Sequence, residues 1–298
     1  MKKFLKDIKE SIPAYILVAP TIAVLCIFLY VPLFNAFRIS LYKYKGYGPM
    51  TDFVGLANYI DVLTDAKFRT AFFNTLEMIC LDMIFSMTIA FFLAYVLFKG
   101  IRFRNGLNAA LFIPYLISTV VVGCIWRIIY DPAIGPLNQL LEMIGLDNLA
   151  HAWLSEPGTA LPAIIVTWIW KTIPFNMLIM YANIMTLPSD YLEAADIDGA
   201  NEWQKIRHIV LPYMKPTFLS LGLLRITNDL RAFDIVWTMS QGGPGGASEV
   251  VTSYVYREAF SKQRFGPATA ASIVMMFLLI CVTVISQIAK MARKKDEE

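Results

Sequence analysis

The sequence predicts an all-α, polytopic membrane protein with six transmembrane helices and one long polar loop that carries helices of its own. The chain has 298 residues, of which 57% are hydrophobic and only 16% are charged, whereas about a quarter of the residues of a soluble domain are charged. Six apolar runs are each long enough to cross a bilayer as a helix, which takes ~20 residues. They cover about residues 12–37, 71–98, 107–130, 161–187, 217–237 and 268–288, and we expect residues 1–298 to form a single transmembrane domain.

The distribution of lysine and arginine orients these predicted spans. Basic residues lie before the first span and after the second, fourth and sixth, whereas residues 131–160 contain no Lys or Arg. Because positively charged loops stay on the cytoplasmic side, we expect a multi-pass protein of the cell (inner or plasma) membrane with both termini in the cytoplasm. The polar loop 188–216 then also lies in the cytoplasm. The first predicted outside loop departs from the rule, since it contains Lys43, Lys45, Lys67 and Arg69.

Polar side chains inside the spans are the candidate substrate pathway. Ionisable groups are costly in hydrocarbon, so they face the interior of a helix bundle or a wet cavity. The candidates are Glu77 in the second span, Lys171 and Asn176 in the fourth, and Asn228 and Asp229 in the fifth. Amides and carboxylates hydrogen-bond hydroxyl groups, and aromatic faces cover the apolar surface of a sugar ring. This combination favours a sugar-like solute.

Each of these polar residues also has a purely structural interpretation. Lys171 can pair with Asp82 or with Glu77, and Arg225 can neutralise Asp229 because the two are spaced i, i+4 on one helix. The fifth span can equally be a water-lined helix that touches no ligand. In the third span we expect Pro114 to kink the helix.

The polar loop 188–216 has the sequence pattern of two short helices. Ser189 is a candidate N-cap of the first helix, and Asp198-Gly199 predicts its end, since glycine accepts the left-handed conformation there. Asn201 followed by Gln204 predicts a capping box that starts the second helix. Pro212 is expected to end that helix.

The second helix of the loop carries an apolar face. Trp203, Ile206 and Val210 are spaced i, i+3 and i+7. Two interpretations remain open on this pattern: a solvated linker whose apolar face rests on the membrane surface, or an element that docks into another protein.

The sequence offers no catalytic site. It contains no phosphate-binding GxxxxGK[ST] motif and no nucleophile with a matching base. The four cysteines all lie in apolar runs without metal-ligand spacing, so we expect buried thiols and no metal site; they are Cys26, Cys80, Cys124 and Cys281. A net charge of +3 gives no indication of nucleic-acid binding.

The loop resembles the EAA loop of the permeases of ATP-binding-cassette (ABC) importers. The resemblance rests on Glu193-Ala194-Ala195, Asp198-Gly199-Ala200, Ile206 and Leu211-Pro212. Other stretches resemble the carbohydrate-type subfamily of these binding-protein-dependent permeases; among them are Asn74-Thr75, Phe233-Asp234, Gly242-Gly243-Pro244 and Tyr254-Val255-Tyr256. The resemblance therefore covers nearly the whole chain.

The resemblance implies a non-catalytic permease subunit that works in an assembly. It implies a second, similar permease, two cytoplasmic ATPase subunits that bind ATP and magnesium, and an extracytoplasmic solute-binding protein that delivers the sugar. This chain itself binds no cofactor. The resemblance also implies that the EAA helix seats in the ATPase with Glu193 as its polar anchor. The coupling residues are then Glu193, Ala194, Ala195, Asp198, Gly199, Trp203 and Ile206.

The main alternative function is a secondary transporter driven by an ion gradient. The acids and the lysine within the spans support it, because proton relays use such residues. The absence of a convincing inverted repeat counts against it. A membrane scaffold or sensor without transport is a third class, which the polar fifth span disfavours.

Overall fold

The computed structural model describes residues 15–100 and 104–296, and these residues are almost entirely helical. Within them the only bridge between extended segments joins Tyr42 and Phe53. The chain divides into two compact units: unit 1 comprises Met1–Thr64 and Val255–Met276, and unit 2 comprises Asp65–Tyr254 and Phe277–Glu298. The single domain expected over 1–298 stays a prediction.

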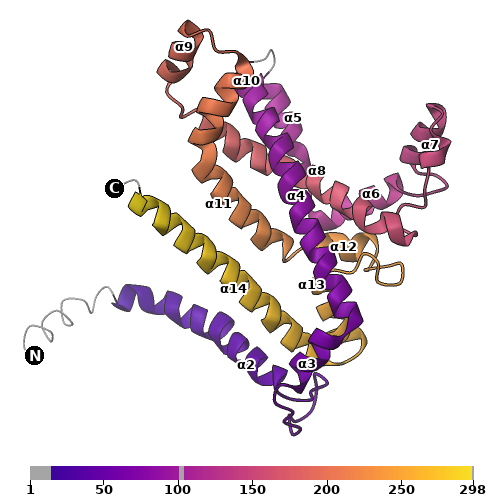
Figure 1. Ribbon diagram of the computed structural model, residues 1–298. Coiled ribbons are helices and arrows are strands. Elements are labelled where there is room, and N and C mark those ends of the chain that lie inside the picture. The colour runs from indigo at the N-terminus through magenta and orange to yellow at the C-terminus, as the bar shows by residue number, and fades with distance from the viewer. Residues whose placement is uncertain (1–14, 101–103, 297–298) are drawn as a thin grey trace, which may run out of the picture. The chain divides into compact units, whose positions relative to one another are not determined.

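Unit 1 is built from two apolar helices and the segments that join their ends (Figure 1). The first helix covers Tyr15–Ser40; it contains a π-helical turn, Cys26–Tyr30, and continues as α2, Val31–Ser40. The first three residues of the predicted span 12–37 lie outside the described residues. Further along the chain come α3 (Ala57–Thr64), a π-helical turn (Arg257–Ser261) and the start of α14 (Phe265–Asp296).

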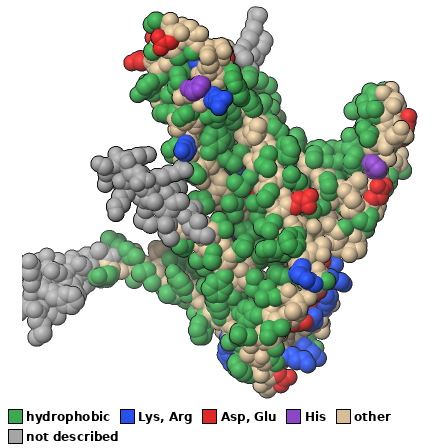
Figure 2. Space-filling view, in the orientation of Figure 1, with side chains coloured by type: hydrophobic (Ala, Val, Ile, Leu, Met, Phe, Trp, Pro, Cys, Tyr) green, Lys and Arg blue, Asp and Glu red, His purple; other side chains and the backbone are tan. Residues whose placement is uncertain are grey.

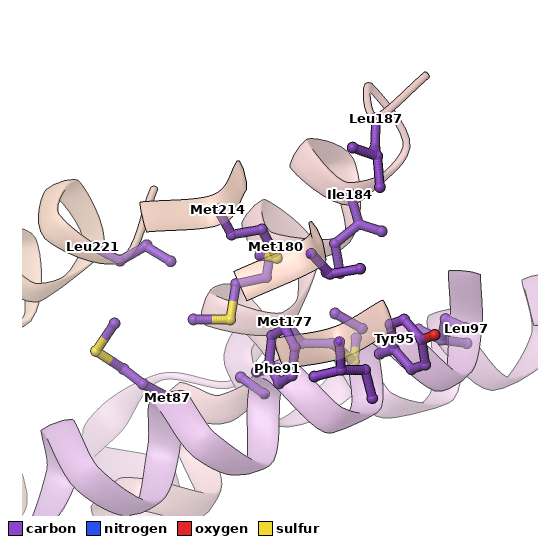
Figure 3. Close-up of a cluster of buried hydrophobic side chains, with 14 residues drawn as sticks. Met87, Phe91, Tyr95, Leu97, Met177, Met180, Ile184, Leu187, Met214 and Leu221 are labelled. Atoms are coloured by element: carbon purple, nitrogen blue, oxygen red, sulfur yellow. The ribbon is translucent and has the colours of Figure 1, made fainter. Parts of the chain in front are cut away.

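In unit 2, helices α4 (Ala66–Phe98) and α8 (Pro157–Ile184) pack together, and α11 (Leu211–Asp229) packs against α4. Figure 3 shows the shared apolar cluster, with side chains of α4, α8 and α11 pointing toward one another. Ala90 and Ala94 of α4 are fully buried in this cluster. Small residues let helix backbones approach closely, and close packing is what holds helices together within a membrane.

The third predicted span is broken and not merely kinked. It consists of α5 (Arg104–Leu116) and α6 (Thr119–Ile129), which are bent by 96° at Ile117 and Ser118. Pro114 lies inside α5 and the break follows it, so the kink expected at this proline itself stays a prediction. Five helices of the described residues are long and apolar enough to cross a membrane, and there are six if the bent pair counts as one span.

The fifth predicted span begins earlier than the sequence indicated. The helix runs without interruption from Glu202 to Asp229 through α10 (Glu202–Lys205), a π-helical turn (Ile206–Val210) and α11. The helix end expected at Pro212 is therefore wrong. Proline lacks an N–H and its ring crowds the carbonyl four residues before it. That carbonyl belongs to His208, which lies within the wider π-helical turn Ile206–Val210, and this turn gives the ring room.

The remaining described helices are short, and one of them, α12, overlaps the end of the predicted span 217–237. They are α7 (Pro136–Met143), a 3₁₀ turn (Asp147–Leu149), α9 (Ser189–Ile197), α12 (Asp234–Met239) and α13 (Val251–Tyr256). The four cysteines, expected to be buried, are all exposed on this chain.

Candidate functional site

A buried ionic network joins three membrane helices at Arg225 of α11. The Arg225 Nε donates to Asp82 Oδ2 of α4 at 2.7 Å, and its Nη2 donates to Asp229 Oδ1 at 2.6 Å. The side chain of Arg225 is 3% exposed and both carboxylates are fully buried. The predicted pairing of Arg225 with Asp229 is confirmed, whereas the pairing of Lys171 with Asp82 is wrong because Arg225 binds Asp82.

Two side chains of α8 complete this network. Trp168 Nε1 donates to Asp229 Oδ1 at 2.8 Å, and Thr172 Oγ1 donates to Asp82 Oδ1 at 2.9 Å. The Trp168 ring also lies 5.6 Å from the Arg225 guanidinium carbon, within the range of a cation–π contact. One acceptor is left over, since Asp229 Oδ2 is buried without a hydrogen-bond partner. The network therefore fixes the positions of α4, α8 and α11 relative to one another.

Lys171 lies at the break between α5 and α6. Its Nζ donates to the Ile117 carbonyl at 2.6 Å and to the Tyr115 carbonyl at 3.4 Å, and it lies 5.8 Å from the centroid of the Tyr115 ring. A helix break frees carbonyls that would otherwise accept intrahelical hydrogen bonds. The buried ammonium group replaces those donors, so Lys171 stabilises the 96° bend.

The other predicted pathway residues fall in two groups. Asn176 is fully buried: its Nδ2 donates to Ser86 Oγ at 3.0 Å and its Oδ1 has no partner. Glu77 and Asn228 are exposed on the chain. Exposed polar groups within a membrane helix require water or a partner chain beside them. The structure thus brings Lys171, Asn176 and Asp229 into the interior of unit 2 and leaves the other two at its surface.

A polar hollow of about 660 Å³ lies at the end of α6 that is followed by Asp131. Its polar lining includes Arg127, Asp131, Ser155, Ser240 and Gln241. The backbone N–H groups of Ile134 and Ala133 donate to the Asp131 carboxyl at 3.0 and 2.9 Å and hold its pKa below the usual value. Asp131 therefore carries its negative charge at neutral pH.

The first helix of the EAA loop (residues 188–216), α9, has no buried residue. Its expected N-cap is wrong, since Ser189 is already helical and Pro188 occupies the capping position without a side-chain donor or acceptor. The predicted end is confirmed: α9 stops at Ile197, and Gly199 has the left-handed φ of +74°. In Figure 2 acidic side chains gather on this helix, at the top of the view.

The second helix of the loop starts with the predicted capping box. Asn201 Oδ1 accepts from the Gln204 N–H at 2.9 Å, and Gln204 Oε1 accepts from the Asn201 N–H at 2.7 Å. The expected apolar face is divided. Ile206 and Val210 are buried in the cluster of Figure 3, whereas Trp203 is 59% exposed.

Glu202 fastens the loop to the end of α4. Tyr95 Oη donates to Glu202 Oε2 at 2.8 Å, and Lys99 Nζ donates to Oε1 at 2.9 Å. Buried Lys205 then joins the two helices of the loop, because it pairs with Asp196 of α9 and with Glu202 at 3.1 Å. We call these five residues the Glu202 clamp. No sequence pattern predicted this clamp, and its one local signal is the i, i+3 spacing of Glu202 and Lys205.

The clamp leaves most of the predicted coupling residues on the surface. Glu193, Ala194, Asp198, Gly199 and Trp203 are exposed, Ala195 is half-buried, and Ile206 is buried within this chain. Large apolar side chains stand beside them, since Tyr191 is 60% and Ile197 is 86% exposed. A hollow of about 330 Å³ lies between the two helices and is lined by Ala195, Asp198, Gly199, Ala200, Gln204, Lys205, His208 and Ile209.

Comparison with protein families identifies one matching family model. Residues 82–292 match the binding-protein-dependent transport system inner membrane component. One curated relative is the trehalose/maltose transport system permease protein MalF of Thermococcus litoralis. It is 30% identical over 277 residues, which is 93% of this chain and 93% of that protein.

Solved structures of similar fold come from a bacterial transporter of alginate. One is a bacterial ABC transporter involved in the import of the acidic polysaccharide alginate; it matches with a TM-score of 0.84 and 26% identity over 98% of this chain and 99% of that chain. The other is a bacterial alginate ABC transporter in complex with an alginate pentasaccharide-bound periplasmic protein. It matches with a TM-score of 0.82 and 27% identity over 94% of each chain.

Proposed function

The chain belongs to the family of binding-protein-dependent transport system inner membrane components, and we propose that it lines the path of a sugar or sugar-like solute into the cytoplasm. It is an ABC transporter permease of the inner membrane. Family membership favours this function over the secondary transporter driven by an ion gradient. The sugar class is supported by the relatives, which include a trehalose/maltose permease and an alginate importer.

The energy for transport comes from ATPase partners that dock on the EAA loop. One observation carries this proposal: α9 buries none of its residues, yet the Glu202 clamp holds it to the membrane helices. A rigid helix that exposes Tyr191, Ile197 and Trp203 has the composition of a docking surface, since aromatic and apolar anchors dominate binding energy. Glu193, Ala194, Ala195, Asp198, Gly199 and Trp203 form the contact surface, and Ile206 supports it from beneath.

The complete importer contains further subunits. We expect an extracytoplasmic solute-binding protein, which the complex of the similar alginate transporter with a periplasmic protein supports. We also expect a second homologous permease and two ATPase subunits, on the strength of family membership alone. ATP and magnesium bind the ATPase subunits, and this chain binds neither. Both termini lie in the cytoplasm in this assembly.

Closure of the ATPase dimer moves α9, and the Glu202 clamp carries the displacement to α4 and to the helix Glu202–Asp229. These helices carry Glu77, Asn228 and Asp229, and α8 carries Lys171 and Asn176. Their movement switches the path between outward-facing and inward-facing states. The polar hollow near Asp131 is the place where the solute enters from the binding protein.

Substitution of Glu193 tests the coupling. Glu193→Arg reverses the charge at an exposed position of α9 and is expected to reduce sugar uptake at least tenfold while membrane insertion stays normal. Glu142→Arg is the matched control, because it makes the same change on an exposed residue of α7 outside the loop. If the Glu193→Arg variant takes up sugar normally and still co-purifies with the ATPase subunits, the docking of α9 is refuted.

A further inference from the structure

Unit 1 contains a basic pocket that the proposed transport function does not use. Its volume is about 510 Å³, and it lies between the loop after α2 and the segment before α14. Four cations line it, Lys43 and Lys45 on one side and Lys262 and Arg264 on the other. Figure 2 shows Lys and Arg side chains gathered around α3, at the bottom of the view, with acidic side chains among them.

The charges of this pocket are only half compensated within the chain. Arg264 pairs with Asp61 and with Glu258, at 3.1 Å for the latter, and Lys262 pairs with Glu258. Lys43 and Lys45 are exposed and make no ion pair in the described residues. Four cations against two carboxylates leave an excess of positive charge on the side of the two lysines. An anionic group therefore fits there.

The walls of the pocket are fixed by close packing. Asn58 Nδ2 donates to the carbonyls of Ser40 and Tyr42 at 2.8 and 3.0 Å, and the Gly266 N–H donates to the Tyr44 carbonyl at 3.3 Å. A side chain at position 266 would place its Cβ 2.4 Å from the Tyr42 carbonyl oxygen, so only glycine permits this approach. The cations are thus presented from a preorganised frame.

The pocket lies where two membrane helices reach the same surface. Helix Tyr15–Ser40 ends three residues before Lys43, and the apolar helix that starts at Phe265 begins directly after Arg264. Tyrosines favour the membrane–water interface. Tyr42, Tyr44 and Tyr47 follow the first helix, and Tyr44 lines the pocket. Cations at the ends of predicted spans, next to tyrosines, are suited to contact lipid headgroups.

We propose that this pocket binds the phosphate of an anionic phospholipid headgroup. Lys43 and Lys45 bind the phosphate oxygens, while Lys262 and Arg264, held by Asp61 and Glu258, form the opposite wall. The proposal also explains why the first predicted outside loop is rich in lysine against the usual distribution of charge. The bound lipid fastens the ends of both helices of unit 1 to the bilayer.

The test is lipid binding to the full chain, purified in detergent and titrated with phosphatidylglycerol or phosphatidylcholine vesicles. Wild type is expected to bind phosphatidylglycerol more tightly. K43S/K45S should weaken this binding about 25-fold, since each lysine near an anionic lipid surface contributes about fivefold. K67S/R69S removes the same charge from exposed positions in the first turn of α4, which do not line the pocket, and should change phosphatidylglycerol binding little. K43R/K45R should restore binding, and gel filtration checks that each variant folds.

Three results would overturn the proposal. If K43S/K45S and K67S/R69S weaken phosphatidylglycerol binding equally, only the overall charge of the protein matters. Displacement of the lipid by millimolar inorganic phosphate means that the pocket takes a free anion. Normal lipid binding by K43S/K45S together with lost sugar uptake means that the lysines contact an acidic surface of a protein partner.

Discussion

Replacement of Arg225 by methionine tests whether the buried ionic network holds the membrane helices together. Arg225 neutralises Asp82 at 2.7 Å and Asp229 at 2.6 Å, and no other cation pairs with either carboxylate in the described residues. Methionine keeps the length and apolar stem but leaves two carboxylates in a dry interior with only Trp168 and Thr172 as donors. Removal of one partner from a buried ion pair costs about 3–5 kcal/mol.

The loss is measurable as thermal stability of the detergent-solubilised chain, followed by the fraction that remains monodisperse after heating for a fixed time. Each kcal/mol lowers the unfolding midpoint by roughly 2–4 °C in a protein of this size class, so Arg225→Met is expected to lower it by about 10 °C. Arg231→Met is the matched control, because the same change occurs six residues later on an exposed side chain.

A second variant separates lost charge pairing from lost packing. The triple change Asp82→Asn, Arg225→Met and Asp229→Asn removes all three charges, and replacement of a whole buried ionic group is often neutral in stability. The triple variant should therefore recover most of the decrease in unfolding midpoint that Arg225→Met causes. Two results would refute the role of the network: equal unfolding midpoints for Arg225→Met and Arg231→Met, or a triple variant with a lower midpoint than Arg225→Met alone.

Three further predictions concern the helix break and the loop. Lys171→Met deprives the Ile117 carbonyl of its donor and should cost about 1–3 kcal/mol, with a lower melting midpoint that Lys171→Arg largely restores; an unchanged midpoint would show that the break needs no donor. Glu202→Gln weakens a partly exposed cluster worth about 1 kcal/mol or less, so the midpoint should barely move while trypsin cleaves the loop faster; equal cleavage rates would exclude the clamp. Gly199→Ala strains a φ of +74° and should cost about 1–2 kcal/mol, which is measured as faster hydrogen exchange over residues 188–210. The helical control Gly158→Ala should leave exchange unchanged, and equal exchange rates in the two variants would contradict the strained turn.

Much of the helical architecture was predictable because membrane spans are recognisable in a sequence by their length and hydropathy. The break after Leu116 was not predictable, since the residues at the bend, Ile117 and Ser118, are ordinary helix formers in a membrane. The continuity of Glu202–Asp229 was missed for the opposite reason. Pro212 suggested a stop, yet a π-helical turn accommodates it and the helix runs on.

In the candidate site, contacts between residues close in the sequence were predictable, whereas contacts between distant residues were not. The capping box of Asn201 and Gln204 and the pair of Arg225 with Asp229 each involve residues a turn apart, and both predictions are confirmed. The contacts of Lys171 and of Glu202 span 54 and 107 positions. Such partners depend on which helix faces pack together, and a single sequence does not contain that information.

The length of two helices has a consequence for where a partner can meet the chain. Helix Glu202–Asp229 has 28 residues and α4 has 33, so at 1.5 Å per residue they measure about 42 and 50 Å. The hydrocarbon layer is only about 30 Å thick. Since the Glu202 clamp joins these two helices at one end, their surplus length can raise that end clear of the lipid by about 10 Å or more. A water-soluble subunit can then reach α9 without touching a single acyl chain.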